Sequence, residues 1–130
     1  MIADTNVLLR AIVRDDPHQG PIARKALADA RIVAVSTSAL CEAAWVLTKR
    51  YKHKPAAAAA AIRGLVNAAN VVTDRQVVDA GLAMLDAGGD FADGVIAFEG
   101  RALGGREFVS FDKEAVTLVR QQGESARLLA

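Results

Sequence analysis

The sequence predicts a single α/β domain, a three-layer sandwich whose central parallel sheet of four to five strands has helices on both faces. Three observations support this prediction. Short β-branched segments alternate along the chain with segments whose apolar residues recur at helical spacing. The 130 residues fit the usual size of one domain. No linker or internal repeat divides residues 1–130, and alternating strands and helices build parallel sheets through right-handed crossovers.

The first half of the chain predicts two strands and four helices. A short apolar start, MIA, precedes a helix over NVLLRAIV, and the turn-rich DDPHQGP separates it from a second helix near residues 22–30. RIVAVS is almost continuously apolar, which is typical of a strand covered on both faces. A third helix is predicted from Ser38 to Tyr51. Pro55 suits the first turn of a fourth helix, whose alanines favour helix formation.

The second half predicts three further strands and three helices. NVVTD is a short strand, and the helix after it carries one apolar stripe and ends at the glycine pair GG. DFADGVIAFEGRALG is a helix that is apolar on most sides, so we expect it to be buried. EFVSF is a strand, DKEAVTLVRQ a helix, and ARLLA a final edge strand.

Composition excludes several classes of protein. No apolar run is long enough to cross a bilayer, and the start of the chain lacks the features of a signal peptide. The single cysteine, Cys41, cannot form an internal disulfide, so we expect a cytoplasmic protein.

Charge is unevenly distributed along the chain. Residues 1–63 carry ten Lys/Arg against five Asp/Glu, a net +5, and residues 64–130 carry six against ten, a net −4. The basic half includes the run KRYKHK, Lys49 to Lys54. This asymmetry is compatible with an anionic partner, although such a run is also typical of a solvated loop.

Five carboxylates follow or adjoin the predicted strands. Asp4 follows the first strand, Asp112 follows EFVSF, and Asp90 and Asp93 open the helix before that strand. Glu42 lies one turn into the helix after RIVAVS. Because ligands of open parallel sheets bind at the carboxyl ends of the strands, we expect these side chains to face one cleft.

Each aspartate also has a purely structural interpretation. Asp4, Asp90 and Asp112 stand where helix caps or Asx turns belong. Asp93, three residues after Asp90, resembles the second member of a capping box. Glu42 has no such role, and its apolar neighbours predict a helix with little exposed surface, where an unpaired carboxylate is costly.

The set of acids predicts a cation. Carboxylates that converge on one cleft repel one another unless a cation compensates. Oxygen ligands without His or Cys favour Mg²⁺ or Mn²⁺ over zinc. Thr5, Asn6 and Ser110 flank the acids and are candidates for holding water or orienting the carboxylates.

Four segments, taken in order, resemble the successive motifs of PIN-domain ribonucleases, most closely the VapC toxins of bacterial toxin–antitoxin pairs. The segments are MIADTNVLLRAIVRDDP, CEAAWVL, DFADGVIA and SFDK, and the resemblance spans residue 1 to about residue 120. It implies that the family's acidic quartet is Asp4, Glu42, Asp93 and Asp112, with Asp90 as an auxiliary acid. Gly94 departs from the pattern, since members more often have alanine there.

The resemblance implies a PIN-like fold and an endoribonuclease that hydrolyses RNA phosphodiester bonds with Mg²⁺ or Mn²⁺. Asp4, Asp93 and Asp112 would bind the metal, and Glu42 would be a ligand or accept the proton of the attacking water. The resemblance also implies a cognate VapB-like antitoxin and a homodimer. Eight basic residues are candidates for contacting RNA or an acidic antitoxin tail: Arg10, Arg14, Arg24, Lys25, Lys49, Arg50, Lys52 and Lys54.

Two other classes share part of the pattern. A haloacid-dehalogenase-type phosphatase uses an aspartate after the first strand and a late acidic motif like GGDFAD, but needs a second aspartate where Asn6 stands. A phospho-receiver domain has a similar size, an acidic Mg²⁺ pocket and a late lysine like Lys113. It requires an adjacent acidic pair after the first strand, which is absent, and leaves Glu42 and Asp93 unexplained.

Overall fold

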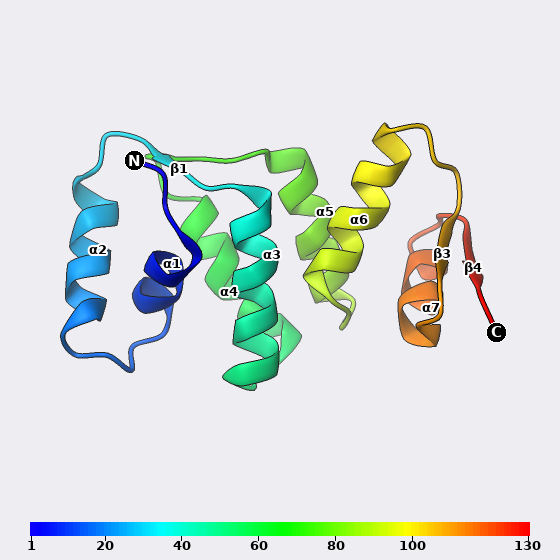
Figure 1. Ribbon diagram of the computed structural model, residues 1–130, viewed down its shortest axis with the longest axis horizontal. Helices are drawn as coiled ribbons and strands as arrows, with labels where there is room; N and C mark the ends of the chain where they lie inside the picture. The colour runs from blue at the N-terminus through cyan, green and yellow to red at the C-terminus, as the bar shows by residue number, and fades with distance from the viewer.

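Seven α-helices and one π-helical turn, η1, make up most of the protein in the computed structural model, which describes residues 1–130 (Figure 1). The helical segments are α1 (Thr5–Ile12), α2 (Gln19–Asp29), α3 (Thr37–Trp45), η1 (Val46–Arg50), α4 (Pro55–Val66), α5 (Arg75–Asp86), α6 (Phe91–Ala102) and α7 (Lys113–Gln121). Local signals explain where several of them begin. Asp4, Ser36, Asp90 and Asp112 accept backbone hydrogen bonds as N-caps, and Pro55 occupies the first turn of α4.

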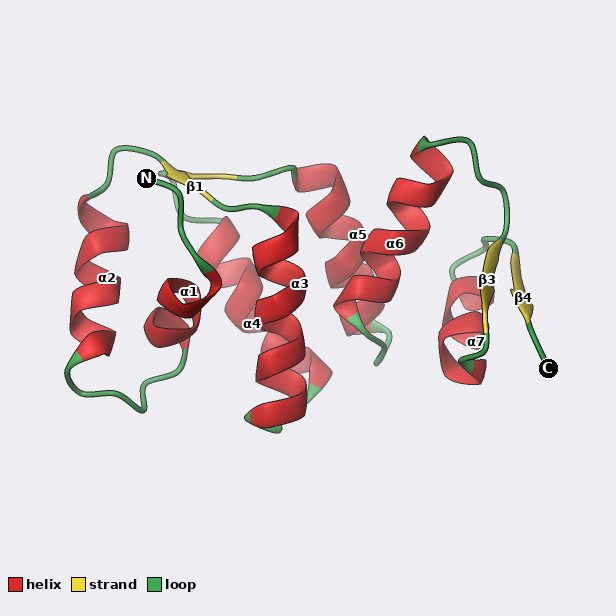
Figure 2. Cartoon of the chain, viewed as in Figure 1, coloured by secondary structure: helices red, strands yellow, loops and turns green.

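The strands are short and parallel, as the alternating pattern predicts. β1 (Val33–Ala34) pairs with β2 (Val71–Val72), and Ile2 adds a parallel bridge to Ala34. β3 (Phe108–Ser110) pairs with β4 (Ala126–Leu128). The two pairs form separate sheets (Figure 2). The parallel α/β character is therefore observed, but the single sheet of four to five strands is not.

The packing of α7 explains the separation. A small core unites Met84 of α5 with Val116, Leu118 and Val119 of α7 and with Ala126 of β4. α7 thereby docks where α5 turns into α6, and it carries β3 and β4 with it. Figure 1 shows the N-terminal segment and the β3–β4 pair towards opposite ends of the long axis. The main core, of 18 buried residues, lies among α1, α3, α4, α5, α6 and the first strands.

Two glycines allow α5 and α6 to pack closely. A Cβ added at Gly81 would lie 2.5 Å from the ring of Phe91, which is almost fully buried. A Cβ at Gly94 would collide with the carbonyl oxygen of Ala80. The absence of a side chain at Gly94 is therefore a packing requirement of this helix pair.

Two expectations about burial are wrong. Glu42 is exposed, and so is Trp45 on the same helix, because α3 turns Leu40, Ala43 and Ala44 towards the core instead. α6 is not buried on all sides, since Ile96 is 57% exposed. None of the helices combines the length and apolar character needed to cross a bilayer.

Candidate functional site

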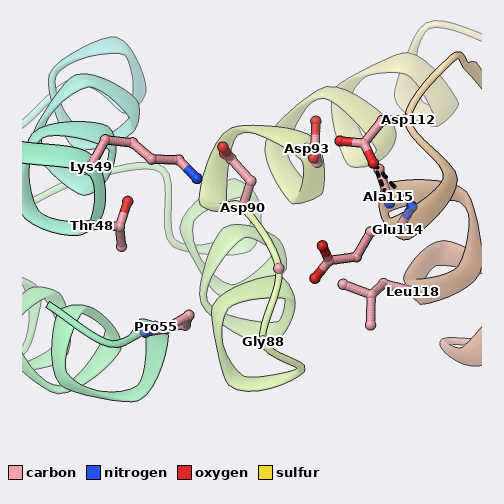
Figure 3. A pocket seen from close by; sticks show the side chains of 11 residues that line it. Thr48, Lys49, Pro55, Gly88, Asp90, Asp93, Asp112, Glu114, Ala115 and Leu118 are labelled. Atoms are coloured by element: carbon pink, nitrogen blue, oxygen red, sulfur yellow. Dashed lines mark hydrogen bonds between the residues drawn. The ribbon is translucent and has the colours of Figure 1, made fainter. Parts of the chain in front are cut away.

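An acidic pocket of about 160 Å³ opens between the end of the α3–η1 segment and the starts of α4, α6 and α7 (Figure 3). Three of the predicted acids, Asp90, Asp93 and Asp112, line it together with Glu114. The remaining lining residues are Thr48, Lys49, Pro55, Gly88, Gly89, Ala115 and Leu118. Carboxylates at the starts of the successive helices α6 and α7 thus share one pocket.

The glycine pair places the start of α6 at this pocket. Gly88 has a φ of +90°, a conformation that favours glycine after a helix end. Gly89 leaves room for neighbouring side chains, since an added Cβ would lie 2.6 Å from Leu118 Cδ1 and 2.9 Å from Met84 Sδ. The chain therefore ends α5 and begins α6 within a few residues, next to Leu118 of α7.

Capping leaves part of each carboxylate free. Asp90 Oδ1 accepts a hydrogen bond from the backbone N–H of Ala92 at 2.7 Å. Asp112 Oδ1 accepts from the N–H groups of Glu114 and Ala115 at 3.0 and 3.2 Å. In both residues Oδ2 makes no hydrogen bond within the protein. Capping and cation binding are therefore compatible, because they use different oxygens of the same side chain.

Asp93 shows the electrostatic consequence of this grouping. Partial burial, reinforced by the charges of Asp90 and Asp112, raises the pKa of Asp93 to about 6. No Lys or Arg forms an ion pair with any of the three. A positive charge entering the pocket would offset the cost of ionising Asp93.

Asp4 and Glu42 lie elsewhere, in a shallow hollow that they share with Ile2, Ala3, Thr5, Ser36, Ser38 and Ala39. Asp4 Oδ1 accepts a hydrogen bond from the N–H of Thr5 at 2.8 Å. The structure therefore divides the predicted quartet into Asp4 with Glu42 and Asp93 with Asp112. The docking of α7 against α5 is the physical reason, because it holds Asp112 beside α6 and away from the N-terminal segment.

The divided quartet bears on metal binding. The donors are all oxygens, as Mg²⁺ and Mn²⁺ prefer, and both cap residues have a free Oδ2. No three acidic, histidine or cysteine side chains, however, lie close enough to hold one ion. The chemistry of the donors suits a divalent cation, but this arrangement does not assemble a complete ligand set.

The three flanking residues occupy different positions. Ser110 Oγ accepts a hydrogen bond from the backbone N–H of Asp112 at 2.9 Å and so helps to fix the backbone at Asp112. Thr5 is buried beside Asp4. Asn6 lines a neighbouring hollow together with Glu42.

Glu114 is a further acid of the pocket and is not among the residues that the sequence predicts for the site. It lies in the first turn of α7, and its side chain reaches into the pocket below Asp112 (Figure 3). The available signal was the spacing Asp-Lys-Glu, which places two acids two residues apart at a helix start.

The predicted basic residues differ in their surroundings. Lys49 lines the acidic pocket. Arg50, the next residue, lines the hollow that Asn6 and Glu42 share. Arg10 donates a hydrogen bond to Gln19 and lies near Asp15 and Asp16, and Lys25 pairs with Asp29. The pockets described do not include Arg14, Arg24, Lys52 or Lys54.

Comparison with known protein families gives one clear match. The family model described as PIN domain covers residues 1–120 and so includes every candidate acid. No curated protein matches the chain.

Proposed function

Because the chain belongs to the PIN-domain family, whose members are generally metal-dependent nucleases, we propose that it is an Mg²⁺- or Mn²⁺-dependent endoribonuclease that hydrolyses RNA phosphodiester bonds. The observation that carries this proposal is the pocket that holds Asp90, Asp93 and Asp112, in which the pKa of Asp93 rises to about 6. Uncompensated acids in a cleft are typical of sites that act on an ion or a proton.

The proposed ligands are Asp93 and Asp112, together with Asp4 from the other hollow. Glu42 is proposed as a further ligand or as the acceptor of the water's proton, and Asp90 as an auxiliary acid that uses its free Oδ2. A divalent cation would supply water activation and charge neutralisation in such a site.

Bringing these acids together requires the N-terminal segment and β3 to become neighbours. The backbone of Ile2 faces away from β1, since Met1 O and Ala3 N make the hydrogen bonds to Ala34. The backbone of Val109 likewise faces away from β4, because its neighbours Phe108 and Ser110 bond to Ser125 and Leu129, which flank that strand. Two free parallel edges of this kind favour pairing with each other. We propose that they join into the central sheet that the sequence predicts.

The biological role proposed is that of a VapC-type toxin in a type II toxin–antitoxin pair. It rests on the resemblance of the four acidic motifs to that group. A cognate VapB-like antitoxin, a homodimer and a cytoplasmic location are proposed on the same basis. An acidic antitoxin segment would meet the basic N-terminal half of the chain.

The direct test is cleavage of labelled RNA with Mg²⁺ or Mn²⁺, against EDTA. We expect Asp93→Asn to lose at least about 100-fold of the activity, the size of loss typical when a group that stabilises the transition state is removed. Asp79→Asn, on the exposed side of α5, should cut normally. Wild-type cleavage by Asp93→Asn would contradict the proposal. Acetyl-phosphate labelling of one aspartate would instead indicate a receiver domain.

A further inference from the structure

One wall of the acidic pocket carries a positive charge. Lys49 is the only basic residue that lines the pocket. In Figure 3 its side chain extends from the helix towards the carboxylate of Asp90 across the opening. Asp93 and Asp112 lie beyond Asp90, so the ammonium group and the carboxylates face the same space.

Lys49 belongs to the π-helical turn η1, which forms that wall of the pocket. Tyr51 N–H bonds to Val46 O at 3.1 Å, an i to i+5 hydrogen bond that widens the turn over Val46–Arg50. The side chains of two successive basic residues in this turn point to different sites. Lys49 lines the acidic pocket, and Arg50 lines the hollow that Asn6 and Glu42 share. Thr48 also lines the pocket, but its hydroxyl donates to Ala44 O at 2.9 Å.

Lys49 is also free to accept an anion. No carboxylate lies within ion-pair distance of its ammonium group, although Asp90 is across the pocket. Arg10 and Lys25, in contrast, already pair with acids of their own helices and loops. A phosphate entering the pocket meets repulsion from Asp90, Asp93, Asp112 and Glu114, and Lys49 carries the only positively charged side chain that opposes it there.

We infer that Lys49 binds the RNA phosphodiester that enters the acidic pocket and so sets where the backbone lies relative to Asp93. This inference rests on the nuclease activity proposed above and selects one cation from the eight basic candidates. The contact between Lys49 and the phosphate forms before the phosphodiester bond is broken, because the ammonium group is charged in the free protein and the phosphate is charged in intact RNA. It therefore contributes mainly to substrate affinity.

The test measures RNA binding apart from cleavage. A fluorescein-labelled single-stranded RNA is titrated with full-length protein in EDTA, and anisotropy is read at several KCl concentrations. Lys49→Met, which keeps the aliphatic stem, should bind about tenfold more weakly, the size of one charge-assisted contact. The slope of log affinity against log salt should fall by about 0.7, the loss of one phosphate contact on a single strand.

Two variants control for charge and folding. Lys49→Arg should restore most of the affinity, because it returns the positive charge. Arg31→Met removes one exposed positive charge that lines none of the pockets described and should bind RNA like the wild type. In cleavage assays with metal, Lys49→Met should raise KM about tenfold and leave kcat nearly unchanged, which separates a substrate contact from a loss of structure.

The outcomes distinguish this inference from the proposed function. If the wild type cleaves RNA and Lys49→Met binds with wild-type affinity and salt slope, the role of Lys49 is wrong and the nuclease proposal stands. If the wild type cleaves no RNA with either metal, the nuclease proposal fails. Weaker binding by Lys49→Met in EDTA would then still support the contact, and equal binding, or no binding by either protein, would overturn it.

Discussion

Leu118 of α7 packs with Met84 of α5, and this contact decides where the last strand pair and Asp112 lie. Both side chains also crowd Gly89, so the α5–α6 turn, α7 and the acidic pocket form one packed unit.

We expect Leu118→Ala to lower the free energy of unfolding by about 2 kcal/mol or more, the cost of removing a buried leucine side chain. Because the lost contacts are those that dock α7, amide hydrogen exchange should accelerate first in β3, β4 and α7. Urea unfolding and hydrogen exchange by mass spectrometry measure the two effects. Thr117→Ala, on the exposed side of α7, should change the free energy much less. Equal losses in the two variants would contradict this role for Leu118.

The raised pKa of Asp93, about 6, predicts a pH dependence of stability. The folded protein binds the Asp93 proton more tightly than the unfolded chain, whose aspartates titrate at about 3.9. The folded state is therefore favoured while Asp93 is protonated, and stability falls as the pH rises from about 4 to about 6 and stays lower above it.

The comparison variant for this effect is Asp93→Asn. We expect its Tm to exceed that of the wild type at pH 7.5 and the difference to shrink towards pH 4. Asp79→Asn, on the exposed side of α5, should show no such trend. Thermal melts from pH 4 to pH 8 decide the matter, and a constant Tm difference between Asp93→Asn and the wild type would contradict the assigned pKa.

Gly94→Ala should destabilise the protein even though alanine is the better helix former. The gain in helix propensity is about 1 kcal/mol. The new Cβ, however, would collide with the carbonyl oxygen of Ala80, and a helix backbone moves away less easily than a flexible side chain does. Overpacking of this kind costs about 1–3 kcal/mol, so we expect a net loss. Gly100→Ala is the matched control in α6, since nothing lies within 4 Å of its added Cβ. A rise in Tm for Gly94→Ala would refute this account of the helix crossing.

The proposed pairing of the Ile2 and Val109 edges is testable by crosslinking. Ile2→Cys with either Phe108→Cys or Ser110→Cys, in a Cys41→Ser background, should form a disulfide under mild oxidation. When the backbones of Ile2 and Val109 both face the joint, the residue opposite Ile2 on the same face of a parallel sheet is Phe108 or Ser110, and paired side chains lie within bonding range. A crosslink within one chain would show closure of the sheet, and one between chains would show that a second copy supplies the edge. Each single-cysteine variant serves as a control. Failure to crosslink in either form would rule out the joined sheet.

Short-range features of this protein were predictable from its sequence, because the interactions that create them span only a few residues. Asp4, Asp90 and Asp112 were each predicted as caps, and each accepts a backbone hydrogen bond within three residues of itself. Pro55 begins α4 as expected. The predicted start of α3 at Ser38 was late, since Ser36 is the cap.

The grouping of the acids depended on contacts between distant parts of the chain. Asp93 shares a pocket with Asp112 because α7 docks on Met84, and Asp4 stays with Glu42 because both lie on the side of the N-terminal segment. The periodicity of α3 did not reveal that Glu42 lies on its exposed face, since that depends on which neighbours cover the helix.

The sequence by itself determined most of the helices and their caps, since local hydrogen bonds and side-chain periodicity specify these, and the alternation of strands with helices predicted parallel strands. Only the tertiary structure decided which acids meet, that Gly94 is a packing requirement, and that Lys49 faces Asp90. The reason is physical: apolar contacts such as that of Leu118 with Met84 choose among several ways of packing the same elements.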